Sequence, residues 1–396
     1  MSPFIFGSLT RHSSIAISSL YHYLSDHPRV LPASEKQIHY FKVCGSCLDS
    51  SKTAFPNLTV FLFRKFCRST VPFQYFPEYP LEWYYRHFPT AKNFLASGAL
   101  ITGEASPGYL PYPAVAYRVA KRMPGPKIIA VGRNPLERSY SSYRYNYVTP
   151  TLDLMKSGKF KHIERGRTDE YYHQFLFSYE DLLRAELDVL RLCFAQDGAG
   201  VVGARKKWTM RESFRREFER RNTTGLPSLV DLEGFCYGKP VNRTVLRPQW
   251  ADLVAQYPEK VFDPSTLHLV QSLIGRSLYT LPLEWWYAMF PASDIYFVCT
   301  EEMRDLSGNP MSELAGFLGL PEYNFSGIVS GGAYNVGGHR GYNKEMKWDS
   351  VKETRVEVNT TRQEALPEAF REELLNFIRP FNERLFQLTG RRCNWT

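Results

Sequence analysis

The sequence predicts an α/β fold in which a central parallel sheet is flanked by helices and carries a large, mostly helical insertion. Between residues 4 and 145, short apolar segments alternate with segments of helical periodicity, which is the order of elements in parallel sheets. The segment from Lys127 to Val131 is apolar after its first residue, as expected of a strand buried on both faces. With 396 residues, 43% of them hydrophobic, the chain is long enough to bury a sizeable core.

The first elements can be placed from their local patterns. Phe4 to Gly7 is expected to form a strand, and Ile15 to Ser25 a helix that ends at His27-Pro28. A second short strand is expected at Ile38 to Phe41. Further elements are a helix at Leu81 to Phe88, a strand at Ala99 to Thr102, a helix at Ala114 to Met123, the strand at Lys127 to Val131, a helix at Leu136 to Tyr145 and a late strand at Ile295 to Thr300.

We expect one domain over residues 1–396, with residues 148–262 inserted into it. The insertion differs from the rest because it is polar and contains a dense run of basic residues mixed with glutamates. Two interpretations stay open for this run: a solvated helix, or one wall of a groove for an anionic polymer. The basic residues are Arg205, Lys206, Lys207, Arg211, Arg215, Arg216, Arg220 and Arg221.

The charge of the chain favours an anionic partner, and a merely basic surface is the alternative. Its formal net charge is +9 and its pI about 9.1. No nucleic-acid-binding module accompanies the basic run, so we expect no nucleic-acid partner. The runs that mark a P-loop NTPase, Gly-x-x-x-x-Gly-Lys-[Ser/Thr], and a serine hydrolase, Gly-x-Ser-x-Gly, are both absent.

Cysteines and glycosylation signals give information on the cellular compartment of the protein. Seven cysteines are present, and Cys44 and Cys47 have metal or redox spacing without a second pair or a His cluster, so we expect no metal. Disulfides are compatible with this count, which would leave one thiol over. Six Asn-x-[Ser/Thr] sequons favour a secretory route. No apolar run is long enough for a membrane span, and no signal-peptide pattern opens the chain.

One segment carries a candidate phosphate site. The strand at Lys127 to Val131 delivers Arg133 at its carboxyl end, Pro135 suits the first turn of a helix, and Ser141 follows on that helix. Ligands of open α/β sheets bind at the carboxyl ends of strands. A guanidinium and a hydroxyl placed there can bind one phosphate, aided by the helix N-terminus.

This segment resembles a motif of sulfotransferases that use 3′-phosphoadenosine 5′-phosphosulfate (PAPS). Arg133-Asn134-Pro135, followed by Arg138 and Ser141, is similar to their 3′-phosphate-binding motif, which implies that Arg133 and Ser141 bind that phosphate. Gly103-Glu104-Ala105-Ser106-Pro107-x-Tyr109 resembles the segment after the second core strand of carbohydrate sulfotransferases. Gly275-x-x-Leu278-Tyr279 and the closing segment from Asn376 to Leu385 resemble the N-acetylgalactosamine 4-sulfate 6-O-sulfotransferase group. The resemblance implies a P-loop-like three-layer sandwich.

A glycine-rich basic segment, residues 337–344, stands where the family has a loop over the cofactor. The resemblance makes Arg340 and Gly341 candidates for cofactor binding, and a plain surface turn is the alternative.

The loop after the first strand departs from the family pattern, Lys-x-Gly-Thr-Thr before a helix that ends in His-Pro. Counting back from His27-Pro28 puts Ser14 at the lysine and Ser18 at the second threonine. Counting forward from Gly7 puts Thr10 at the lysine, with Ser13 and Ser14 as the hydroxyls. Because neither alignment finds a lysine, Arg11 or His12 is expected to supply the positive charge. We expect the hydroxyls of Ser13, Ser14 and Ser18 to contact the cofactor.

The second departure concerns the catalytic base. Carbohydrate sulfotransferases use a glutamate in a Glu-x-His-Phe-Phe-like segment, and this chain has Gln37-Ile38-His39-Tyr40-Phe41 instead. Gln37 cannot accept the proton, so His39 is the first candidate and Glu35 the second. A histidine simply packed in a strand is the alternative.

The resemblance therefore implies an enzyme that transfers a sulfuryl group from PAPS to a hydroxyl of a carbohydrate, with an anionic or neutral polysaccharide as acceptor and no metal. It also implies a Golgi or secretory lumen, with any membrane anchor outside this sequence. Because two positions of the pattern are lost, the alternative is a catalytically weak or inactive protein of the same fold that binds anionic glycans.

Overall fold

The computed structural model describes residues 2–8, 14–38, 40–42, 81–195, 252–261, 272–334, 345–346 and 366–395. The chain forms two compact units. The first, called the sheet unit, comprises Met1–Lys42, Glu78–Arg138 and Leu278–Thr396, and the second, called the helical unit, comprises Val43–Pro77 and Ser139–Ser277. The expectation of one domain with residues 148–262 inserted stays a prediction.

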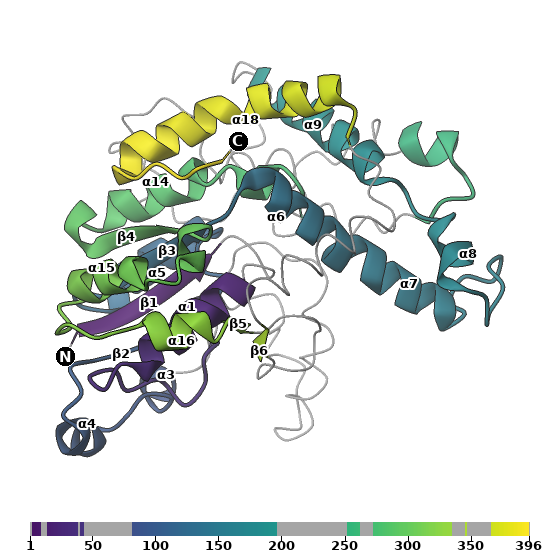
Figure 1. Ribbon diagram of the computed structural model, residues 1–396. Helices are drawn as coiled ribbons and strands as arrows, with labels where there is room; N and C mark the ends of the chain where they lie inside the picture. The colour runs from purple at the N-terminus through teal and green to yellow at the C-terminus, as the bar shows by residue number, and fades with distance from the viewer. Residues whose placement is uncertain are drawn as a thin grey trace, which may run out of the picture. The chain divides into compact units, whose positions relative to one another are not determined.

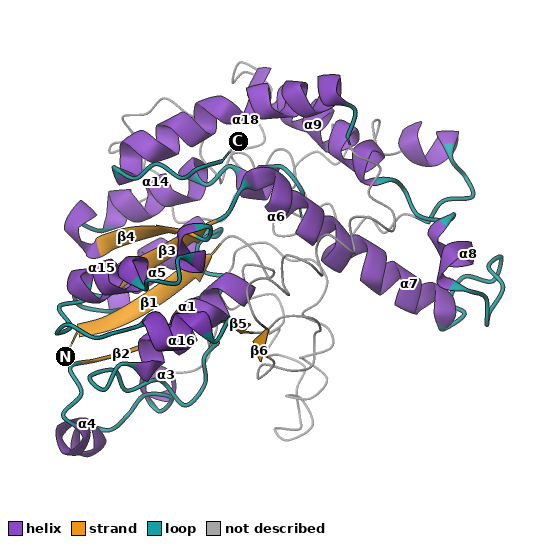
Figure 2. Cartoon of the chain, in the orientation of Figure 1, coloured by secondary structure: helices purple, strands orange, loops and turns teal. Residues whose placement is uncertain are grey.

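The sheet unit contains a parallel sheet of four strands, shown in orange in Figure 2. β1 pairs with β2 on one side and with β3 on the other, and β4 pairs with β3, which gives the order β2-β1-β3-β4. The order of the strands reverses at β1, because β2 lies on one side of it and β3 on the other. Ligands of such sheets are expected at the carboxyl ends of the strands, beside this point of reversal. The strands are β1 (Ser2–Ser8), β2 (Ile101–Ala105), β3 (Lys127–Gly132) and β4 (Ile295–Cys299).

Helices cover both faces of this sheet, and the side chains of β3 point alternately to these two faces. Ile128 and Ala130 point to one core cluster, and Ile129 and Val131 to the other. The α/β arrangement of a parallel sheet between two helical layers is therefore confirmed (Figure 1). The first cluster lies under α5 (Pro113–Arg122), α14 (Thr280–Met289) and α18 (Glu368–Thr389), and the second under α1 (Ser14–Asp26), α15 (Asn309–Phe317) and α16 (Ser326–Ser330).

The strand predicted at Ile38 to Phe41 is wrong. The structure instead has a 3₁₀ turn, η1 (Tyr40–Lys42). Side chains satisfy the backbone here: the Ile38 amide donates to Glu104, the Phe41 amide to Tyr109, and the Phe41 carbonyl accepts from Arg118. A segment whose backbone groups bond to side chains has no need of a neighbouring strand.

Shorter elements complete the sheet unit. The helix predicted at Leu81 to Phe88 is found as α3 (Leu81–Tyr85), and β5 pairs with β6 in an antiparallel ribbon. The remaining short elements are α4 (Ala91–Ser97), η8 (Ala292–Asp294), η9 (Glu302–Arg304), β5 (Ala333–Tyr334) and β6 (Glu345–Met346).

Where the helical unit is described, it consists mainly of helices. The helix after β3, α6 (Pro135–Ser142), continues through a π-helical turn, η4 (Tyr143–Val148), into α7 (Thr149–Lys156), and so runs beyond the predicted end at Tyr145. The basic run between Arg205 and Arg221 lies outside the described residues. The unit also contains α8 (Asp169–His173), α9 (Tyr179–Ala195) and η7 (Gly275–Ser277). Across all described ranges, no helix combines the length and apolar character that a membrane span requires.

Candidate functional site

Arg133 follows the last residue of β3, and its backbone is fixed on two sides. The Arg133 amide donates to the hydroxyl of Tyr279 at 3.1 Å, and the same hydroxyl donates to the Arg133 carbonyl at 2.9 Å. The preceding carbonyl, of Gly132, accepts from both the amide and the hydroxyl of Thr300 at 2.8 and 2.6 Å. The turn that presents Arg133 at the carboxyl end of the sheet is thus bonded to the residue before α14 and to the residue after β4.

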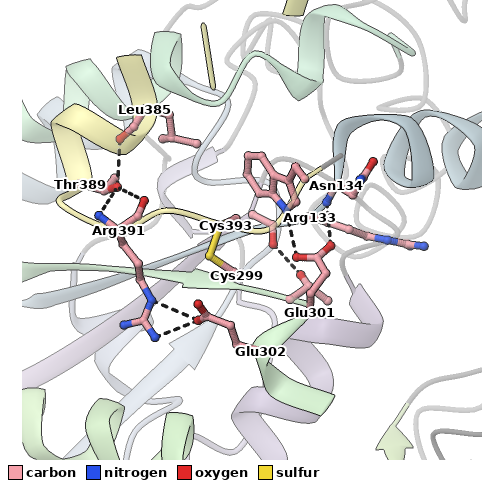
Figure 3. Close-up of a disulfide and its surroundings, with 12 residues drawn as sticks. Arg133, Asn134, Cys299, Glu301, Glu302, Leu385, Thr389, Arg391 and Cys393 are labelled. Carbon is pink, nitrogen blue, oxygen red and sulfur yellow. Dashed lines mark hydrogen bonds and ion pairs between the residues drawn. A yellow bond between two sulfur atoms is a disulfide. The ribbon is translucent and has the colours of Figure 1, made fainter. Parts of the chain in front are cut away.

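The C-terminal tail, residues 390–395 after α18, is also linked to the turn that carries Arg133 (Figure 3). A disulfide joins Cys299, the last residue of β4, to Cys393, with Cα atoms 5.7 Å apart. Two residues further, Trp395 donates from Nε1 to Oε2 of Glu301 at 3.0 Å. Oε1 of Glu301 accepts the Asn134 amide at 2.8 Å. Glu301 therefore connects the tail to the turn that carries Arg133.

Removing the disulfide should destabilise the sheet unit. In the double variant Cys299→Ala, Cys393→Ala, we expect the free energy of unfolding to fall by about 2–5 kcal/mol, because the crosslink no longer restrains the unfolded chain. Urea unfolding under non-reducing conditions measures this loss. As a control, Thr389→Val at the end of α18 removes the hydrogen bonds of one hydroxyl to Leu385 and Arg391 and should cost about 1.5 kcal/mol, less than the crosslink. A double variant as stable as the wild type would show that non-covalent contacts alone hold the tail.

The start of α6 explains how Arg133 is presented. Oδ1 of Asn134 accepts the amides of Leu136 and Glu137 at 3.0 and 3.3 Å, so Asn134 caps the helix. Because these amides are already bonded, an anion at this position would depend on side chains more than on the helix N-terminus. The guanidinium of Arg133 is buried and lies 2.8 Å from Oε2 of Glu137, whose side chain is 42% exposed. An incoming anion would therefore compete with the carboxylate of Glu137 for this guanidinium.

The other predicted site residues lie in different places. Ser141 is on α6 and partly exposed, Ser14 begins α1, and Ser18 is buried on α1. Glu35 is at the surface, with its carboxylate 4.0 Å from Nδ1 of His87. Arg11, His12, Ser13, His39, Arg340 and Gly341 lie outside the described residues.

A buried carboxylate, not predicted as a functional residue, organises the carboxyl end of β2. Glu104 is fully buried and accepts four hydrogen bonds. Oε1 accepts from the hydroxyls of Tyr84 and Tyr109 at 2.9 and 2.8 Å, and Oε2 accepts from the hydroxyl of Ser106 at 2.6 Å and from the Ile38 amide at 3.2 Å. Burial raises the pKa of Glu104, and the hydrogen bonds oppose this rise.

This network positions the segment that leads to the candidate base. Glu104 bonds to the Ile38 amide, and the Ala105 amide donates to the Lys36 carbonyl at 2.7 Å. Residues 36–38, which immediately precede His39, are therefore attached to the end of β2. The sequence contained a signal for Glu104, namely a carboxylate inside a strand that is otherwise apolar or small. Its four donors come from three separate segments and could not be assigned from the sequence.

Lys36 is a second residue that the sequence analysis did not assign. Its Nζ donates to Oγ of Ser18 on α1. No local pattern marks this lysine, because its partner is on another element. Within the described ranges, no three or more His, Cys, Asp and Glu side chains form a group that could hold a metal ion.

Comparisons with known proteins support the resemblance to sulfotransferases. No family model matches the chain. It is 23% identical over 383 residues to the membrane-associated sulfotransferase kil1 of Dictyostelium discoideum, in a match that covers 94% of this chain and 63% of that protein. The chain thus spans somewhat less than two thirds of the length of this curated relative. Membership of the N-acetylgalactosamine 4-sulfate 6-O-sulfotransferase group stays a prediction.

Two solved structures are also similar to this chain. One is a crystal structure of a sulfotransferase from Alicyclobacillus acidocaldarius, with a TM-score of 0.44 and 17% identity, covering 99% of this chain and 98% of that one. The other is the sulfotransferase domain from the curacin biosynthetic pathway, with a TM-score of 0.38 and 11% identity, covering 97% and 98%.

Proposed function

We propose that this protein is a sulfotransferase that transfers the sulfuryl group of PAPS to a hydroxyl of a carbohydrate. The observation that carries the proposal is Arg133, presented at the carboxyl end of β3 by bonds to Tyr279, within a motif similar to the family's 3′-phosphate site. The similarity to a sulfotransferase along 94% of the chain supports the same reaction.

The described residues fit a nucleotide that carries phosphates. The Arg133 guanidinium has an exposed carboxylate as its partner, which a phosphate can replace with stronger, bidentate hydrogen bonds. When bound, PAPS supplies the sulfuryl group: a bond forms between sulfur and the acceptor oxygen, and the bond from sulfur to the 5′-phosphate oxygen breaks. The acceptor proton passes to a base of the protein.

The residue roles follow from the resemblance. Arg133 and Ser141 bind the 3′-phosphate, and the hydroxyls of Ser13, Ser14 and Ser18 contact the 5′-phosphosulfate, with Arg11 or His12 nearby. Arg340 and Gly341 cover the cofactor. We favour His39 as the base over Glu35, because the carboxylate of Glu35 lies beside His87 and is 63% exposed.

A polysaccharide acceptor and an oxidising compartment complete the proposal. The net charge of +9 favours an acidic polymer over a small neutral acceptor and does not require nucleic acid. The disulfide between Cys299 and Cys393 supports a secretory compartment such as the Golgi lumen, because disulfides persist in oxidising environments.

Calorimetry with adenosine 3′,5′-bisphosphate (PAP) and adenosine 5′-monophosphate tests the proposal. We expect the wild type to bind PAP and to bind the monophosphate much more weakly, since the latter lacks the 3′-phosphate. Transfer from sulfur-labelled PAPS to a panel of polysaccharides then measures activity. If the protein binds anionic glycans but not PAP, the proposal is wrong and a glycan-binding protein without catalysis is the better description.

A further inference from the structure

The side chain of Lys36 is directed at the helix that follows the first strand. Its Nζ donates to Oγ of Ser18, and the side chain of Ser18 is buried on α1. In the alignment counted back from His27-Pro28, Ser18 takes the place of a threonine that contacts the 5′-phosphosulfate. An ammonium group therefore lies beside one of the hydroxyls expected at that end of the cofactor.

The backbone places Lys36 at the edge of the sheet where ligands bind. Its carbonyl accepts the amide of Ala105, the last residue of β2, at 2.7 Å. Two residues later, the Ile38 amide is bonded to Glu104. Lys36 is thus anchored at the carboxyl end of a parallel strand next to β1, and ligands of such sheets bind at these ends.

The ammonium of Lys36 is in a half-buried position that favours its neutral form. Loss of contact with water lowers its pKa to about 8. The titratable groups on the packed segments have other partners: Tyr21 on α1 bonds to a carbonyl of β2, Glu35 lies beside His87, and Glu104 accepts its four donors. An anion bound beside Lys36 would stabilise the charged form and raise this pKa again.

We infer that Lys36 supplies the positive charge for the 5′-phosphosulfate end of the cofactor, in place of the lysine that the loop after β1 lacks. The inference rests on the proposed function and adds a residue to it. The ammonium group would come from the segment that precedes the candidate base His39 and bonds to α1, whereas the lysine of the family lies in the loop itself. There it would stabilise the negative charge that develops on the departing 5′-phosphate oxygen.

Two ligands and three variants test this role by binding alone. PAP carries both phosphates, whereas adenosine 3′-monophosphate lacks the 5′-phosphate that Lys36 would contact. Lys36→Met keeps the length of the side chain without its charge, and Lys36→Arg keeps the charge. Lys127→Met is the matched control, because Lys127 begins β3 at the opposite end of the sheet, where it pairs with Asp294 at 2.9 Å.

We expect Lys36→Met to weaken PAP binding by about 10- to 100-fold at pH 7, the range for a hydrogen bond to a charged group. Its affinity for adenosine 3′-monophosphate should not change. Lys36→Arg should restore most of the loss, and Lys127→Met should bind both ligands like the wild type. In the wild type, PAP affinity should be highest below about pH 8 and fall as the pH rises above it, because Lys36 of the unliganded protein loses its proton there. In Lys36→Met this fall should be absent.

The failures of the two proposals can be told apart. If the wild type binds neither ligand, the proposed function itself is wrong. If the wild type binds both ligands and Lys36→Met binds PAP equally well, with the same pH dependence, Lys36 is a structural residue and the inference is overturned. The inference is also overturned if PAP affinity of the wild type does not fall above about pH 8, and this outcome does not depend on the folding of any variant.

Discussion

Replacing Arg133 by alanine should remove the preference of the protein for PAP over adenosine 5′-monophosphate. The side chain would bind the 3′-phosphate that only PAP carries, and charge-assisted bidentate bonds are the strongest that a protein makes to such a group. We expect PAP affinity to fall by about 100-fold, or about 3 kcal/mol, with little change for the monophosphate. Calorimetry with both ligands gives the two affinities.

Two further variants act as controls for Arg133. Glu137→Gln removes the competing carboxylate, 2.8 Å from Arg133, and should strengthen PAP binding by a small factor, since solvent screens the 42% exposed carboxylate and such a pair is worth about 1 kcal/mol or less. Arg122→Ala removes an exposed arginine from the last turn of α5 and should have no effect. If Arg133→Ala weakens both ligands equally, the residue supports the fold of the site and does not bind the 3′-phosphate.

Replacing Glu104 by alanine should destabilise the sheet unit more than any other single change proposed here. The change leaves three hydroxyls and the Ile38 amide without their acceptor in a fully buried site, and it opens a cavity. We expect the free energy of unfolding to fall by about 3–5 kcal/mol, because each unsatisfied buried donor costs about 1–3 kcal/mol before the surroundings relax. Denaturant unfolding of the purified variant measures it.

Milder changes separate the contributions within this network. Tyr84→Phe removes one donor and leaves the carboxylate with three, so it should cost about 0.5–1.5 kcal/mol. Tyr109→Phe also removes the acceptor of the Phe41 amide and should cost more than Tyr84→Phe. Glu313→Ala removes a carboxylate that is 60% exposed and should cost less than about 1 kcal/mol. A Glu104→Ala variant no less stable than Glu313→Ala would mean that water replaces the carboxylate and that the network is not a structural anchor.

The Arg133 site shows how far sequence reasoning reaches in this protein. The strand at β3, the break after it, Pro135 in the first helical turn and the placement of Arg133 at the carboxyl end were all predicted, and the structure has them. Each depends on signals within a few residues: a continuous apolar run, a proline and a change of periodicity. What holds Arg133 in place was not predicted, because Tyr279 and Glu301 come from distant segments.

The segment from Ile38 to Phe41 shows where local reasoning fails. Its residues suit a strand, yet the structure bonds its backbone to the side chains of Glu104, Tyr109 and Arg118. Propensity is a weak preference that such tertiary bonds override.

By itself, the sequence placed the four strands of the sheet along the chain, the two faces of that sheet and the motif that ends in Ser141, because periodicity and turn chemistry act over neighbouring residues. Only the tertiary structure decided that Cys299 pairs with Cys393, which donors surround Glu104, and that Lys36 meets Ser18. Those contacts join residues that are far apart in the chain, 94 positions in the disulfide. They depend on how the strands are ordered and how the helices pack, which no short stretch of sequence encodes.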